Sequence, residues 1–434
     1  MPDSLTTQTL ARLHATRLSG LDGLDDDAIF PAYDGLSIAN VAPTLAALLG
    51  IDLGAGPSLW SPFWEAWRGR VDRIVFVILD ALGYLALQEA LALQPDLAFS
   101  RVARAGVLAP LTSVFPSTTT AATTTFATGQ PPAAHGMLGY ELFLREFSRT
   151  ANMILLSARG AQRSGELLPL GLKHESFIPV PSVAQALAAQ GIPTFALLPA
   201  SILDSGLSRL QYRGAHMLPY VNVADMWVGV RHLLTARAGQ PALVTVYWPG
   251  VDSVAHHYGP DTEMAAAEIR NIAFSLGREL LDGLAPGARR RTLLVLCADH
   301  GQVRSRPQDI VDVAHHPGIS QRLLFGPTGE ARAAYLYARQ GEKVALLDHL
   351  HSHLARQFAA WDSQVAVSAG LFGAPVYEET LARVGDVVLV GRGTVSLHAE
   401  GIHAPADKLP GRHGALSPAE MLVPWLAAHL EDIV

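Results

Sequence analysis

The stretch RIVFVILDALGYLALQEAL, residues 73–91, contains the clearest strand pattern in the sequence. Five apolar residues, Val75 to Leu79, lead directly into Asp80, and a helical pattern begins soon afterwards. A continuous apolar run followed by a helix is typical of a parallel strand that is buried on both faces and joined to the next strand by a crossover helix. This stretch therefore predicts an α/β protein.

Similar apolar runs recur farther along the chain, at residues 193–200, 242–248 and 292–301. Amphipathic helical patterns fall between them, for example at residues 182–191 and 263–284. Strands that alternate with helices in this way predict a mostly parallel sheet covered by helices on both faces.

The pattern changes from about residue 302 to residue 403, where the strands become shorter and two-sided. The elements predicted there are strands at 331–339 and 384–393 and a helix at 342–358. We therefore expect a smaller α+β lobe, residues 302–403, inserted into a sheet domain made of residues 1–301 and 404–434. Residues 417–434 are expected to form a final helix, with Ser417 as its N-cap.

The composition is that of an ordinary globular protein, with 434 residues, a net charge of −7 and one cysteine, Cys297. The charge excludes a broad basic surface for nucleic acid. Proline, glycine and serine interrupt the long uncharged stretches, so we expect no membrane span. The N-terminal residues lack the apolar core of a secretory signal, and a single cysteine fits a reducing compartment, so we expect a cytoplasmic protein. The composition leaves the oligomeric state open.

A threonine-rich stretch, VFPSTTTAATTTFATGQPPAAHG at residues 114–136, contains no Asp, Glu, Lys or Arg. Threonine suits buried strands, and its hydroxyl can cap a helix, so a structural role is one interpretation. The other is a nucleophilic hydroxyl, which needs a base or a metal ion to activate it.

Acidic and imidazole side chains follow the predicted strands, and ligands of such sheets bind beyond the carboxyl ends of the strands. Alone, each of these residues fits a cap or a turn, but together they form a set of metal-ligand type. Carboxylates mixed with imidazoles suit zinc, with manganese as the next choice, and six such groups are enough for two ions. The six residues are Asp80, Asp252, His256, Asp299, His300 and His413.

The order of these motifs resembles that of the alkaline phosphatase superfamily, in particular its type I phosphodiesterase and nucleotide pyrophosphatase branch. The matching stretches run from Asp80 to His413. The nucleophile of that family lies ten residues before the glycine of a TG…P…HG segment. Counting back from Gly129 gives Thr119, with Thr118 and Thr120 as the alternatives.

The resemblance implies two zinc ions, or manganese in their place. One ion would be held by Asp80, Asp299, His300 and the oxygen of Thr119. The other would be held by Asp252, His256 and His413, with His403 as the alternative to His413. The implied activity is hydrolysis of phosphodiester or nucleotide pyrophosphate bonds in a small-molecule phosphate ester or nucleotide, through a covalent phosphothreonine-type intermediate.

One position departs from the family pattern. Nucleotide pyrophosphatases usually have an asparagine four residues after the HG pair, where its amide helps to hold a phosphate oxygen, and this chain has Tyr140 there. A phenol can also donate a hydrogen bond to the substrate, but its reach and bulk differ.

Other functions of the same fold therefore remain open: the protein could be a phosphonate hydrolase of the phosphonoacetate type, a phosphomonoesterase, or a catalytically inactive binding module. A phosphoglycerate mutase would need a serine, such as Ser117, as its nucleophile. A sulfatase would need a C-x-P-x-R type segment, which the only cysteine, Cys297, does not supply.

Overall fold

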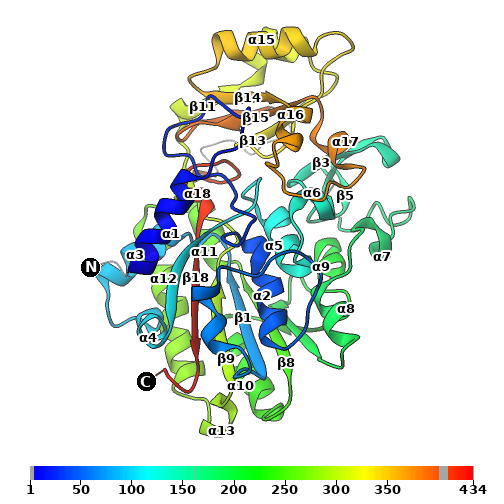
Figure 1. Ribbon diagram of the computed structural model, residues 1–434. Coiled ribbons are helices and arrows are strands. Elements are labelled where there is room, and N and C mark those ends of the chain that lie inside the picture. The colour runs from blue at the N-terminus through cyan, green and yellow to red at the C-terminus, as the bar shows by residue number, and fades with distance from the viewer. Residues whose placement is uncertain (1–3, 162, 400–408, 434) are drawn as a thin grey trace.

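Two β-sheets form the frame of the molecule in a computed structural model that describes residues 4–161, 163–399 and 409–433 (Figure 1). In the larger sheet, β1 pairs in parallel with β8 and β9, and β6 pairs in parallel with β8 and β7. Its strands are, in spatial order, β2 (Val107–Thr112), β18 (Leu422–His429), β9 (Thr292–Cys297), β1 (Arg73–Leu79), β8 (Ala242–Trp248), β6 (Thr194–Pro199) and β7 (His216–Tyr220).

Helices cover both faces of this sheet, as the sequence predicts (Figure 1). Helices α3 (Tyr84–Leu93), α10 (Val223–Ala236) and α12 (Glu263–Ser275) pack together on one face, and α2 (Val41–Leu48), α5 (Thr119–Thr128) and α8 (Val183–Ala188) pack together on the other. All seven residues of β1 are buried, which explains its continuous apolar run. Within the described ranges, no helix is both long and apolar enough to cross a lipid bilayer.

The prediction of a final helix at 417–434 is wrong for most of this segment. Only α18 (Pro418–Met421) is helical, and the strand β18 follows it directly. This strand pairs antiparallel with β9 on one side and with β2 on the other, and all eight of its residues are buried. A strand buried on both faces has no apolar–polar alternation, so its sequence does not distinguish it from a buried helix.

The smaller sheet is antiparallel and combines two distant parts of the chain. Its order is β14 (Phe358–Asp362), β15 (Val387–Gly391), β13 (Ala333–Leu336), β12 (Thr328–Gly329), β3 (Glu141–Leu144), β4 (Arg149–Asn152) and β5 (Ser157–Ala158). The predicted strands β13 and β15 and the predicted helix α15 (Lys343–His353) are confirmed. The proposed boundaries of the lobe, 302–403, remain a prediction. Strands β3 to β5 lie earlier in the chain and belong to the same sheet.

A buried ion pair joins the two sheet regions. Arg332, between β12 and β13, is fully buried and makes two hydrogen bonds to Glu420 of α18, from Nε to Oε1 (2.7 Å) and from an Nη to Oε2 (2.8 Å). Glu420 also accepts hydrogen bonds from the Ala415 backbone and the Ser417 hydroxyl. The pair therefore fixes the turn beside β12 to the segment that leads into β18.

We expect Arg332→Ala to lower the free energy of unfolding by about 3–5 kcal/mol, because it leaves the buried Glu420 carboxylate without its partner. Urea unfolding followed by circular dichroism would measure the change. Arg209→Ala, which breaks an exposed ion pair with Asp204, is the control and should have a much smaller effect. Equal losses in the two variants would contradict the prediction.

Candidate active site

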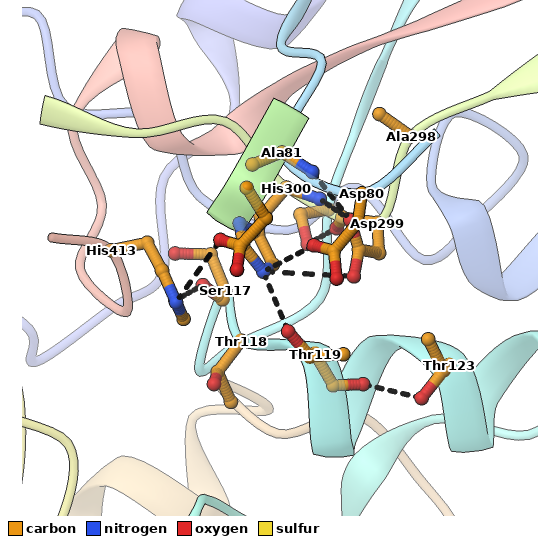
Figure 2. A network of polar contacts seen from close by, with 12 residues as sticks. Asp80, Ala81, Ser117, Thr118, Thr119, Thr123, Ala298, Asp299, His300 and His413 are labelled. Carbon is orange, nitrogen blue, oxygen red and sulfur yellow. Dashed lines mark hydrogen bonds and ion pairs between the residues drawn. The ribbon is translucent and has the colours of Figure 1, made fainter. Parts of the chain in front are cut away.

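Thr119 is the first residue of α5, and it lies beside the imidazole of His300. Its Oγ1 is 3.2 Å from His300 Nε2 (Figure 2). The later threonines of this helix have a structural role, because the hydroxyls of Thr124 and Thr128 donate to backbone carbonyls four residues earlier. The later threonines therefore support the helix, whereas the Thr119 hydroxyl lies at a polar cluster, and its role as a nucleophile stays a prediction.

The alternative nucleophiles have different surroundings. Thr118 precedes the helix, and its hydroxyl donates to the Glu330 carboxylate (2.6 Å). The Thr120 hydroxyl is buried and makes no hydrogen bond. Of the three adjacent threonines, Thr119 is the one whose hydroxyl lies within hydrogen-bonding distance of His300.

Three of the predicted ligands meet where β1 and β9 end. Asp80 follows β1, and Asp299 and His300 follow β9, and all three are buried. His300 Nε2 is 3.5 Å from Asp80 Oδ1 and 3.6 Å from Asp299 Oδ2 (Figure 2). Both of these carboxylate oxygens are buried and have no hydrogen-bond partner. Buried oxygens of this kind are expected where a cation completes the site.

The other three predicted ligands form a second cluster beside the first. Asp252 and His256 lie one turn apart on α11 (Gly250–Tyr258), with 3.3 Å between Asp252 Oδ1 and His256 Nε2. His413 Nε2 lies 4.0 Å from the same Asp252 oxygen. Pairing of β10 (Val303–Arg304) with β17 (Gly411–Arg412) brings His413 to this position.

The two clusters touch. The rings of His300 and His413 stack with their centroids 3.9 Å apart. Asp252 is close to both clusters: its ligand atoms lie within 4.8 Å of those of His256 and His413, and also within 4.8 Å of those of Asp80 and His300. All six predicted carboxylate and imidazole ligands are therefore brought together, and Thr119 lies beside one of them, His300.

Backbone carbonyls set the orientation of the three imidazoles. The Nδ1 atoms of His256, His300 and His413 lie 2.8, 3.0 and 3.1 Å from the carbonyl oxygens of Gly411, Gly301 and Ser117, respectively. A proton on Nδ1 leaves the lone pair of Nε2 directed at the cluster. This arrangement is common for histidines that bind metal ions.

Electrostatics also favours a cation at this position. Burial raises the pKa of Asp80 well above its usual range, and the carboxylates of Asp299 and Asp252 raise it further. Burial lowers the pKa of His413 well below its usual range, and the His300 and His256 imidazoles lower it further. Buried carboxylates in contact with the His413 imidazole, whose neutral form burial favours, therefore fit divalent cations, which would stabilise the ionised carboxylates.

A cavity of about 370 Å³ opens beside these residues, and Thr119, Asp252, His256, His413, Tyr140 and Glu330 contribute to its wall. Tyr140 reaches it from the smaller sheet region, so the substrate-binding position predicted from the sequence faces the same cavity as Thr119. The Tyr140 backbone N–H donates to Glu330 Oε1 (2.9 Å). The cavity thus lies between the two sheet regions.

Three further residues at this site were not predicted from the sequence. The Tyr247 hydroxyl donates to Asp80 Oδ2, Gln302 Nε2 donates to Asp252 Oδ1, and Glu330 accepts from Thr118. Tyr247 and Gln302 stand close to predicted ligands in the sequence, at the end of β8 and just after Asp299–His300, and that proximity is a usable signal. Glu330 has no such signal. His403, the alternative to His413, lies outside the described residues.

The fold, with carboxylates and imidazoles gathered at one edge of its sheet, is that of a hydrolase of the alkaline phosphatase superfamily, acting on phosphoric ester bonds. The family model of type I phosphodiesterase/nucleotide pyrophosphatase matches residues 74–416, so the chain belongs to this family. A comparison with curated protein sequences gives no match.

Solved structures of two kinds share the fold. Murine ectonucleotide pyrophosphatase/phosphodiesterase 5, as an inactive threonine-to-alanine variant in complex with AMP, is 17% identical, with a TM-score of 0.62 over 82% of this chain and 87% of that chain. Phosphonoacetate hydrolase from Sinorhizobium meliloti 1021, in complex with phosphonoacetate, is 19% identical, with a TM-score of 0.60 over 82% of this chain and 90% of that chain.

Proposed function

We propose that the protein is a two-zinc hydrolase that cleaves phosphodiester or nucleotide pyrophosphate bonds, with Thr119 as its nucleophile. The observation that carries the proposal is the gathering of six metal-ligand side chains at one site, where His300 lies beside the Thr119 hydroxyl and two buried carboxylate oxygens have no partner. The inactivity of the threonine-to-alanine variant of the murine protein, which has the same fold and binds AMP, supports both a threonine nucleophile and a nucleotide substrate.

The residues divide into two sets of ligands. Asp80, Asp299, His300 and Thr119 would hold one cation, and Asp252, His256 and His413 would hold the other, with Asp252 also close enough to Asp80 and His300 to contact the first. Nitrogen and oxygen ligands in this proportion suit zinc, with manganese as the alternative. When bound, two such cations would acidify the nucleophilic hydroxyl and neutralise negative charge on the phosphoryl oxygens and the leaving oxygen.

In the first step, Thr119 Oγ1 attacks phosphorus in line with the leaving group. The Thr119 hydroxyl proton is released to solvent as a new P–O bond forms to Thr119; the P–O bond to the leaving group breaks, and the leaving oxygen takes a proton from solvent. In the second step, water attacks phosphorus and releases a proton, the P–O bond to Thr119 breaks, and Thr119 Oγ1 takes up a proton to restore its hydroxyl. Tyr140, on the cavity wall, would orient the phosphoryl group in place of the usual asparagine.

A second candidate function is phosphonate hydrolysis, favoured by the shared fold of the phosphonoacetate hydrolase bound to phosphonoacetate. A phosphomonoesterase and an inactive binding module are the remaining alternatives. The cytoplasmic location remains a prediction from the sequence.

Metal analysis combined with a substrate panel tests the proposal. We expect two zinc ions per chain, and hydrolysis of bis-p-nitrophenyl phosphate and of the p-nitrophenyl ester of thymidine monophosphate. Chelation should abolish both activities, and added zinc should restore them. Preferred hydrolysis of phosphonoacetate would favour the second candidate, and a metal-loaded protein that turns over no substrate in the panel would favour the binding module.

A further inference from the structure

Glu330 is an acidic residue on the wall of the cavity that Thr119 also lines. It follows β12 directly, and it lines the cavity together with Thr118, Thr119 and Tyr140. Its Oε1 accepts two hydrogen bonds, from the Thr118 hydroxyl (2.6 Å) and from the Tyr140 backbone N–H (2.9 Å). These contacts join the residue before the nucleophile to the substrate-binding position predicted from the sequence.

The surroundings hold Glu330 in this position. A Cβ atom added to Gly414, the residue after His413, would lie 3.0 Å from Glu330 Cβ, so this backbone segment packs closely against the Glu330 side chain. Arg332, two residues later, is anchored by its buried ion pair with Glu420. Glu330 is therefore fixed on both sides rather than free to turn away from the cavity.

The negative charge of an ionised Glu330 would repel an anionic substrate. Burial raises the pKa of its carboxyl to about 7, whereas the hydrogen bonds from Thr118 and Tyr140 favour the ionised form. Arg412 lies on the same cavity wall and offsets part of the negative charge. Above pH 8 the carboxylate would repel a phosphoryl group, and the repulsion grows with each negative charge on that group.

We propose that Glu330 is a specificity-determining residue that favours singly charged phosphodiesters over phosphoryl groups with two negative charges. This inference rests on the proposed function, because it takes the cavity beside Thr119 to be the phosphoryl site. A monoester dianion or inorganic phosphate meets the carboxylate with one more negative charge than a diester does. The carboxylate therefore disfavours the doubly charged phosphoryl group more strongly than the singly charged one.

Glu330→Gln tests the role, because the amide keeps an oxygen that can accept from Thr118 and Tyr140 but removes the charge. At pH 8.5, with the zinc-loaded protein, we expect kcat/KM for p-nitrophenyl phosphate to rise about tenfold, equivalent to about 1.4 kcal/mol. The kcat/KM for bis-p-nitrophenyl phosphate should rise only about threefold, because Coulomb repulsion scales with the charge of the ligand, so the ratio of the two values should rise about threefold. Glu378→Gln, an exposed residue that does not line the cavity, is the matched control and should leave the ratio unchanged.

A binding measurement separates this inference from the proposed function. By calorimetry, Glu330→Gln should bind inorganic phosphate about tenfold more tightly and the singly charged dimethyl phosphate only about threefold more tightly. This readout needs no turnover, so it remains valid if the hydrolase activity itself is not found. An unchanged affinity for phosphate, or equal gains for the two ligands, would overturn the role of Glu330.

Discussion

Thr119→Ala is expected to lower turnover by at least about a thousandfold while leaving the fold intact, because the variant lacks the attacking oxygen. Asp80, Asp299 and His300 remain in place, so bound zinc should persist. Steady-state kinetics on bis-p-nitrophenyl phosphate, zinc content by mass spectrometry and a thermal melt measure the three quantities. Thr119→Ser, which keeps a hydroxyl, should retain part of the activity.

A matched control comes from the same helix. The hydroxyl of Thr128 donates to the Thr124 carbonyl (2.8 Å) and does not line the cavity, so Thr128→Ala should keep turnover near that of the natural protein. Wild-type turnover in Thr119→Ala would place the nucleophile elsewhere, with Thr118 and Thr120 the next residues to test.

Asp252→Asn should cause a comparable loss of turnover, at least about a thousandfold, for a different reason. The ligand atoms of Asp252 lie within 4.8 Å of those of His256 and His413 and of those of Asp80 and His300. A neutral amide at this position is a poor ligand for zinc. We therefore expect zinc content to fall at both sites. Zinc analysis and kinetics on the same preparations would measure the effect.

Two further variants show whether Asp252 has this double role. His256→Ala should remove about one zinc ion per chain, because it leaves the cluster of Asp80, Asp299 and His300 intact. Asp261→Asn changes an exposed carboxylate that pairs with Arg304, and should leave both ions bound. Full zinc content in Asp252→Asn would remove this residue from the metal site.

The central strands could be predicted from sequence because burial on both faces leaves a continuous apolar run. The runs at 73–79 and 242–248 are β1 and β8, and the confirmed α/β architecture follows from them. The same rule fails for β18. Its alanines and leucines suit a helix equally well, and only its position between β9 and β2 makes it a strand. Long-range pairing of this kind leaves no local pattern.

The site could be anticipated because its ligands stand at strand ends, and the ends of parallel strands meet at one edge. Asp80 and Asp299 are brought together in this way by the register of β1 with β9. Their roles and that of Tyr140 stay predictions until tested. Glu330 could not be found, because it reaches the cavity from a two-residue strand of the other sheet, where nothing nearby in the sequence marks it.

The position of β18 also determines when the protein can finish folding. In the larger sheet β2 pairs with β18, and Thr112 of β2 lies opposite Leu422, which follows it by more than three hundred residues in the chain. During synthesis, β9 and β2 therefore expose unpaired edges until residues 422–429 leave the ribosome. A chain stalled before that point would leave two sheet edges open to pairing with other chains.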